Sequence, residues 1–168
     1  MSHSEAWAIF PGDRVECIAE FANSWGTAPA IWRPLTKRYV ALGRYEHWLQ
    51  SLDRLWPLAD DERLPLHHRA ALALTFDRWY VARAHYARLA LDLTGFFSDF
   101  PVPPEHVNHW PAIISILESE PGYPSIGFMW TSVSNNPWLP SYGADDEPIP
   151  LDWGKVVSLY DALEAPDA

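Results

Sequence analysis

A long run of apolar residues at helical spacing, within residues 65–94, constrains the fold more than any other feature of this sequence. Leu72, Phe76 and Trp79 recur at steps of three and four, and this spacing places them on one face of a helix. Pro65 stands at a common first position of a helix, and Gly95 stands where helices commonly end. The pattern predicts one helix over residues 65–94, about 45 Å long. In a 168-residue chain, a helix of that length would have to be central, kinked or projecting.

Other segments show the same helical spacing. Helices are expected over residues 13–24, 34–56 and 110–119, where apolar side chains recur at steps of three and four. A last amphipathic helix is expected over residues 152–164, with Asp152 as its cap. Together with the long central helix, these segments predict a bundle of about five helices.

The sequence therefore predicts a mainly α fold in a single domain that covers residues 1–168 and is helical over residues 13–119. The C-terminal third is expected to be irregular, because residues 121–150 contain six prolines. Its many tryptophans and tyrosines argue against disorder, and a structureless segment of this length in a compact domain is usually functional or disordered. Within it, residues 125–133 fit either a short strand or a buried turn.

The negative charge of the chain is gathered toward its C-terminal end. The net charge is −10, and residues 1–94 contain 11 basic and 11 acidic residues. Residues 95–168 contain 11 acidic residues and a single base, Lys155. A surface of one sign repels nucleic-acid phosphates and anionic lipids, so neither nucleic acid nor a membrane is an expected partner. The same surface attracts a basic protein, although acidity can also serve solubility alone.

No motif in the chain indicates a particular reaction. His106 and His109, with Glu105 beside them, are too few ligands for a zinc site on their own. The GYPSIG stretch places a proline before Ser125 and does not match the strand–turn–helix context of a nucleophile elbow. Neither common phosphate-binding glycine loop is present. We therefore predict no catalytic residues, no metal and no cofactor.

The N-terminus and the cysteine content favour a cytoplasmic protein. The first ten residues, MSHSEAWAIF, lack the basic start and the long apolar run of a signal peptide. No apolar run in the chain approaches the roughly 20 residues needed to cross a bilayer. Cys17 has no second cysteine in the chain to pair with, which fits a reducing compartment.

Arg83 lies in the middle of the apolar face of the helix expected over residues 65–94. A buried arginine needs a partner, because an unpaired buried charge is very costly. Three interpretations remain open: an interior ion pair, a charge that lines a groove for a ligand or a partner, or a helical phase that differs from the one expected. Stacking on Trp79 or Tyr86 is compatible with the first two.

A group of acids between prolines and large aromatics suggests a binding surface. Tryptophan and tyrosine are enriched at binding hot spots, and flanking carboxylates would steer a cationic partner. Prolines lower the entropy that is lost when a loop becomes ordered. The alternative is an irregular connection whose aromatics only cover the helices. The expected partner-binding residues are Trp138, Tyr142, Asp145, Asp146, Glu147, Asp152 and Trp153.

These features predict a non-enzymatic acidic protein that binds and inhibits a basic protein partner. In general character the chain is similar to immunity proteins, which neutralise bacterial toxins and are often cytosolic, compact and acidic. That resemblance implies a toxin with a basic active site as the partner. The first alternative is a small-molecule-binding helical protein or enzyme, with an aromatic pocket and Arg83 holding an anionic group. The second alternative is a structural or scaffold subunit, and the sequence does not indicate an oligomeric state.

Overall fold

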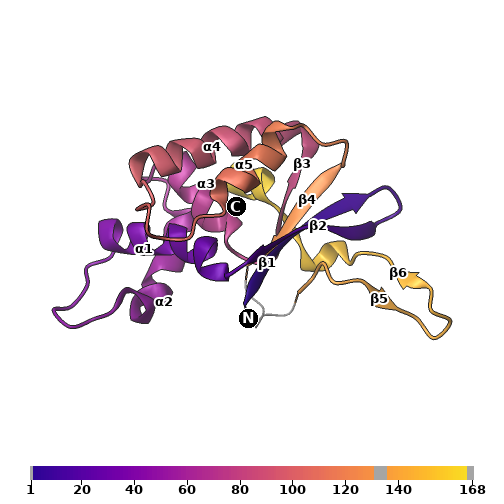
Figure 1. Ribbon diagram of the computed structural model, residues 1–168, viewed down its shortest axis with the longest axis horizontal. Helices are drawn as coiled ribbons and strands as arrows, with labels where there is room; N and C mark the ends of the chain where they lie inside the picture. Colours follow the sequence, from indigo (N-terminus) through magenta and orange to yellow (C-terminus); the bar gives the residue numbers. More distant parts are fainter. Residues whose placement is uncertain (1, 131–135, 166–168) are drawn as a thin grey trace.

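A five-stranded mixed sheet forms the centre of the protein, in a computed structural model that describes residues 2–130 and 136–165 (Figure 1). The strand order is β2-β1-β4-β3-β7, in which β3 and β7 run parallel and the other neighbours are antiparallel. The prediction of a mainly α or all-α bundle is therefore wrong, because the protein mixes helices with a substantial sheet. The strands of this sheet are β1 (His3–Phe10), β2 (Arg14–Ala22), β3 (Trp79–Ala82), β4 (Ser125–Met129) and β7 (Val157–Ser158).

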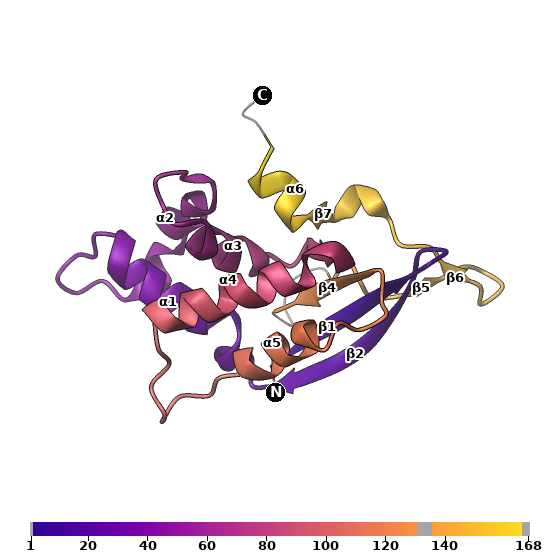
Figure 2. The same ribbon diagram turned by 90° about the horizontal axis from the view of Figure 1, so that it is seen from above.

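Helices cover one face of the sheet. Figures 1 and 2 show α4 and α5 side by side over it, and α3 packs against α4. The core between these layers contains the fully buried aromatics Trp110, Phe128 and Trp130, with the last two stacked at a centroid distance of 5.0 Å. The helices are α1 (Ala28–Tyr39), α2 (Leu52–Leu55), α3 (Leu66–Leu74), α4 (Tyr86–Asp99), α5 (Trp110–Glu118) and α6 (Leu159–Leu163).

The opposite face of the sheet carries a smaller apolar cluster. Side chains of a strand alternate between the two faces of a sheet. Ala6 of β1 and Phe128 of β4 therefore belong to the core under the helices, whereas Trp7 and Met129 belong to the second cluster. Trp138, from the segment that follows β4, completes this cluster. The two central strands are consequently buried on both faces.

The helix expected over residues 65–94 is instead three elements, α3, β3 and α4. Trp79 and Val81 face the core under the helices, whereas Tyr80 packs against the second cluster, and this is the alternation of a strand. Tryptophan, tyrosine and valine are all favoured in strands. Pairing of β3 with β4 and β7 outweighs the apolar spacing that matched a helix.

The first expected helix, at the N-terminal end, is instead the edge strand β2. Ala6 of β1 pairs with Ala19, but the next residue, Trp7, pairs with Cys17, which leaves Ile18 as the extra residue of a bulge. The bulge interrupts the two-residue period of the strand. Ile18 and Ala19 both pack against the core under the helices, whereas Val15 packs against the second cluster, so their helical spacing does not reflect one helical face.

The helix expected over residues 34–56 is displaced and broken. α1 begins at Ala28, so Pro34 lies inside it rather than at its first position, and the helix ends at Tyr39. Residues 40–47 form a loop, and the remainder consists of two short 3-10 turns and α2. The helix expected over residues 110–119 is confirmed as α5.

The C-terminal third contains more regular structure than its prolines suggested. The described part of residues 125–133 includes the central strand β4, which decides between the two interpretations of that stretch. A separate two-stranded sheet follows, formed by β5 (Ser141–Tyr142) and β6 (Pro148–Ile149). The helix expected over residues 152–164 is reduced to α6, preceded by a 3-10 turn and β7. Among the helices of the described residues, none combines the length and the apolar character needed to cross a membrane.

Candidate functional site

A two-stranded hairpin, residues 139–150, projects from the body of the protein; we call it the acidic arm (Figure 1). Its strands pair Ser141 with Ile149 and Tyr142 with Pro148. The amide of Gly143 donates to the carbonyl of Glu147 at 2.9 Å, which closes the turn. All ten residues from 141 to 150 are exposed. The arm is thus an ordered hairpin that makes little contact with the rest of the chain.

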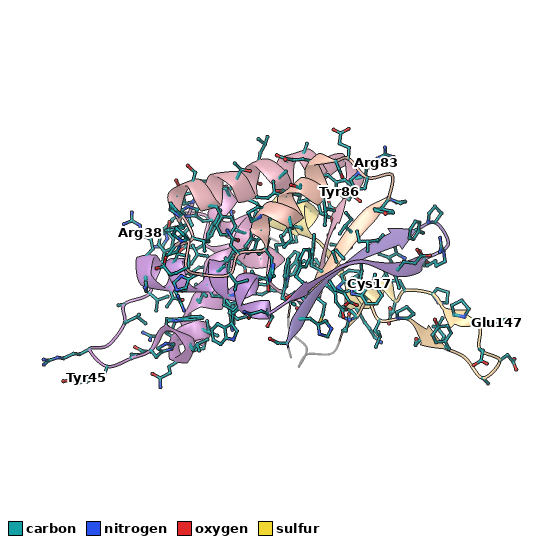
Figure 3. The ribbon with its side chains drawn as sticks, viewed as in Figure 1. Cys17, Arg38, Tyr45, Arg83, Tyr86 and Glu147 are labelled. Atoms are coloured by element: carbon teal, nitrogen blue, oxygen red, sulfur yellow. The ribbon has the colours of Figure 1, made fainter. Side chains whose placement is uncertain are left out.

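Three carboxylates occupy the tip of the acidic arm. Asp145, Asp146 and Glu147 lie in the turn between β5 and β6, and Figure 3 shows Glu147 at the outer end of the molecule. Asp146 has a φ of 57°, in the left-handed region that aspartate and asparagine tolerate better than most residues. The arm contains no lysine or arginine. The tip is therefore a concentrated negative charge on a defined backbone.

Apolar and aromatic side chains stand beside these acids without being covered. Tyr142 is 62% exposed, and Ile149 and Leu139 are exposed as well. Exposed apolar side chains close together, with a charged rim, are typical of protein-interaction sites. The structure therefore brings Tyr142 together with the three acids, as the sequence suggested.

The first root of the acidic arm is fixed inside the protein by Trp138. This side chain has no exposed surface, and its indole N–H donates to the Phe128 carbonyl at 3.0 Å. Its ring lies over Gly127, where an added Cβ would stand 2.5 Å from the ring. Asn136 donates to the buried carboxylate of Glu5 at 3.2 Å. The expectation that Trp138 contacts a partner is corrected, because its ring is enclosed and anchors the arm instead.

The second root is fixed to the turn between β1 and β2. The amide of Leu151 donates to the Asp13 carbonyl at 3.0 Å, and the Trp153 indole N–H donates to Asp13 Oδ1 at 2.7 Å. The Trp153 ring also packs edge-on against Tyr80. Trp153 remains 42% exposed, so it is an anchor with a free edge. Asp152 caps the 3-10 turn by accepting from the Gly154 amide and lies 3.7 Å from Lys155.

Arg83 is exposed and does not have the buried position expected for it. It occupies a 3-10 turn between β3 and α4, and its backbone amide donates to the Pro124 carbonyl at 2.9 Å. The expectation of a buried or groove-lining charge assumed a continuous helix through this point. Because β3 ends at Ala82, the helical phase that placed Arg83 inside the apolar face does not exist.

The acids of residues 95–168 do not all belong to one surface. Asp99 lies against two histidines of α3, and Glu164 pairs with Arg88 of α4. Glu118 and Glu120 stand at the end of α5. The acidic arm therefore carries only part of the charge excess, which corrects the expectation of a single acidic face.

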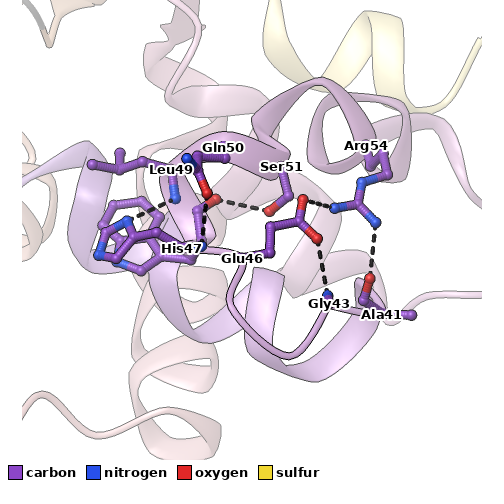
Figure 4. Close-up of polar contacts among 9 residues, drawn as sticks. Ala41, Gly43, Glu46, His47, Leu49, Gln50, Ser51 and Arg54 are labelled. Atoms are coloured by element: carbon purple, nitrogen blue, oxygen red, sulfur yellow. Dashed lines mark hydrogen bonds and ion pairs between the residues drawn. The ribbon is translucent and has the colours of Figure 1, made fainter.

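Sequence reasoning missed a second projection, the loop at residues 40–47. Tyr45 is 88% exposed at its tip, at the opposite end of the molecule from the acidic arm (Figure 3). The loop is braced by Glu46, which accepts from the Gly43 amide and pairs with Arg54 (Figure 4). The polar residues after Gly43 indicate a loop, but the apolar spacing on either side of them matches a helix.

The structure also separates the histidines considered for metal binding. His109 donates from Nε2 to the Ala22 carbonyl at 2.6 Å, whereas His106 is exposed. Among the described residues, metal-ligand geometry occurs at a different place, where His67, His68 and Asp99 converge. No model of a known protein family matches the chain, and neither the curated proteins nor the solved structures contain a match to it.

Proposed function

We propose that this protein is a non-enzymatic binding protein whose acidic arm docks into a basic site on another protein. The observation that supports this most is the hairpin itself: three carboxylates at its tip, exposed Tyr142 beside them and both roots fixed to the sheet. A projecting hairpin fits a concave surface better than a flat one. Occupation of a basic active site by the arm would inhibit the partner by excluding its substrate.

The fixed roots favour binding because the arm need not be ordered on contact. Immobilising side chains and loops during association costs free energy, so a preorganised hairpin binds more tightly than a flexible one with the same residues. Trp138 is enclosed at one root, and Trp153 is hydrogen-bonded to Asp13 at the other. Proline on either side of the strands restricts the backbone further.

The tip carboxylates and the exposed Tyr142 have different roles in the proposed binding. The tip carboxylates would accelerate encounter with a cationic surface, and this acceleration falls as salt screens the charges. Tyr142 would then supply contact area in the bound complex, since tyrosine is enriched among hot-spot residues. The narrower expectation, an immunity protein acting on a bacterial toxin, stays a prediction, because no comparison bears on it.

The experiment is affinity capture from an extract of the source organism at low and at high salt, followed by identification of the captured proteins. The arm variant is Asp145→Asn, Asp146→Asn and Glu147→Gln together. The matched control is Glu118→Gln, Glu120→Gln and Asp161→Asn, which removes the same charge from exposed positions outside the arm.

The proposal predicts a basic protein that is captured by the wild type and the control variant at low salt and released at high salt. The arm variant should fail to capture it. For the apolar contact, Tyr142→Ala should weaken binding of the purified partner about tenfold, whereas Tyr45→Ala at the other end should not. Equal capture by the arm variant and the control variant would refute the proposed site.

A second candidate, small-molecule binding, is favoured by a groove of about 490 Å³ between α1 and the loop after α4. Trp25 and Phe100 line it together with two bases, Arg33 and Lys37. Aromatic walls with a few polar groups are typical of ligand sites. In this candidate function, the anionic ligand would bind in this groove rather than at Arg83. Quenching of tryptophan fluorescence by such a ligand in the wild type, and no quenching in Arg33→Gln, would support it.

A further inference from the structure

Three helix ends meet on the side of the protein away from the acidic arm. Tyr39 is the last residue of α1, His67 and His68 lie in the first turn of α3, and Asp99 is the last residue of α4. Figure 3 shows Arg38, which precedes Tyr39, at the opposite end of the molecule from the tip of the arm. Any role of this cluster is therefore separate from the function proposed for the arm.

Two imidazoles in this cluster converge on one carboxylate oxygen. Nε2 of His67 lies 2.6 Å from Asp99 Oδ2, and Nε2 of His68 lies 2.9 Å from the same oxygen. The three ligand atoms all lie within 4.8 Å of one another. Two imidazole nitrogens and one carboxylate oxygen directed at one place are a ligand set that zinc accepts, with a fourth position left for water.

A zinc ion would fit between these atoms after a small movement. Zinc binds histidine nitrogen at about 2.0–2.1 Å and carboxylate oxygen at about 2.0–2.2 Å, so its tetrahedral ligands stand about 3.3 Å apart. The two Nε2 atoms, which lie within 4.8 Å of each other, would have to come closer together, and the His67 side chain, which is 30% exposed, can turn toward His68. The carboxylate of Asp99 would also have to move outward by roughly half an ångström from its present hydrogen-bonded position. Its side chain is 49% exposed at the end of α4, where such a movement meets little resistance.

The ring of His68 is held in an orientation suited to metal binding. It is buried and packs against Phe96 and Phe100, at centroid distances of 5.8 and 5.0 Å. Its Nδ1 lies 2.7 Å from the hydroxyl oxygen of Tyr39. A metal-bound imidazole usually donates its other N–H to an oxygen, and the Tyr39 hydroxyl can accept that bond.

We propose that His67, His68 and Asp99 bind one divalent transition-metal ion, with zinc preferred, and that Tyr39 is a positioning residue for His68. Without an ion, each Nε2 carries a proton and donates it to Oδ2. With an ion bound, each Nε2 supplies a lone pair and its proton moves to Nδ1. The bond between His68 and Tyr39 then reverses, so that the imidazole donates and the hydroxyl oxygen accepts.

The test uses the full chain without an affinity tag and with Cys17→Ser, so that the exposed thiol of Cys17 cannot bind the ion. Zinc binding is measured by calorimetry, and cobalt is used as a spectroscopic substitute. The proposal predicts one ion per chain and the visible absorption of four-coordinate cobalt. Asp99→Asn and His67→Gln should each raise the dissociation constant about 100-fold, because each removes a ligand. The matched control combines Glu105→Gln with His106→Asn, two exposed side chains outside the cluster.

Tyr39→Phe tests the positioning role separately. It should raise the dissociation constant about tenfold and leave one ion per chain, which is the size of effect expected for an outer partner of a ligand. Nitrogen-15 NMR of His68 should show the proton on Nδ1 when zinc is bound and on Nε2 when it is absent. No saturable binding by the wild type, or equal binding by Asp99→Asn, would overturn the proposal. Loss of binding in the control variant would do so too.

Discussion

The indole N–H of Trp153 donates a hydrogen bond of 2.7 Å to the carboxylate of Asp13, and this contact joins the second root of the acidic arm to the turn between β1 and β2. Asp13 is held in the left-handed region, with a φ of 61°, and its carbonyl also accepts from the Leu151 amide. The turn between β1 and β2 thus positions a hairpin that begins more than 120 residues later. The direction of the arm depends on this contact as well as on Trp138.

Trp153→Phe should loosen the arm without unfolding the protein. Phenylalanine can still pack on Tyr80 but cannot donate to Asp13, so we expect a loss of about 1 kcal/mol in the free energy of unfolding. Hydrogen exchange should quicken at the Gly143 amide, whose bond to Glu147 closes the arm. Urea unfolding and exchange measured by mass spectrometry check both. If exchange in the arm is unchanged, Trp153 does not hold it.

Gly127→Ala should disturb the first root of the arm. An added Cβ would stand 2.5 Å from the Trp138 ring, so either the ring or the strand must shift, at a cost of roughly 1–3 kcal/mol. In a Trp138→Leu background the same change should cost much less, which a double-mutant cycle measures. Gly122→Ala is the control, since a Cβ there meets no atom within 4 Å. Equal costs in the two backgrounds would mean that Trp138 does not cover Gly127.

The ion pair of Asp61 with Arg63 predicts a pH dependence of stability at low pH. Arg63 donates from Nε and Nη2 to its two oxygens, at 2.8 and 2.7 Å, and this pairing lowers the pKa of Asp61 from 3.8 to about 2. Because the folded pKa is the lower one, the contact stabilises the fold above about pH 3.8 and is lost as the pH falls through about 2. The effect on stability is small, since the pair is exposed.

NMR titration of the Asp61 carboxyl carbon measures that shift directly. The midpoint should lie near pH 2 in the wild type and should rise toward 3.8 in Arg63→Gln. The rise should be partial, because the backbone amide of residue 63 still donates to Asp61. Glu62→Gln should leave the midpoint unchanged. A wild-type midpoint near 3.8 would show that the Arg63 contact does not form in solution.

The exposed tip of the acidic arm could be anticipated from sequence, but the sheet could not. Prolines and acids around Tyr142 indicate an exposed, irregular element, and the structure places the three tip acids together on a hairpin. Trp79 continues the helical spacing of Leu72 and Phe76, and only the pairing of residues 79–82 with distant strands shows that this stretch is a strand. The spacing of apolar residues along a short stretch carries no information on pairing with distant strands, or on the bulge at Ile18.

The roles of several single residues depend on long-range packing and could not be predicted from the sequence. Nothing local distinguishes Trp138, which covers Gly127, from Trp153, which keeps a free edge. The convergence of His67 and His68 on Asp99 was hidden for the same reason. A single helix over residues 65–94 would carry the two histidines far from Asp99, whereas a break at β3 lets α4 fold back against α3.

The association rate of the captured partner, measured over a range of salt concentrations, tests the central claim most directly. If the acidic arm is the docking surface, the rate for the wild type should fall steeply with salt, and the rate for the Asp145→Asn, Asp146→Asn, Glu147→Gln variant should be slow and nearly independent of salt. The Glu118→Gln, Glu120→Gln, Asp161→Asn variant, with the same net charge, should behave more like the wild type. Identical salt dependence in the two variants would contradict the claim, because net charge alone would then account for the encounter.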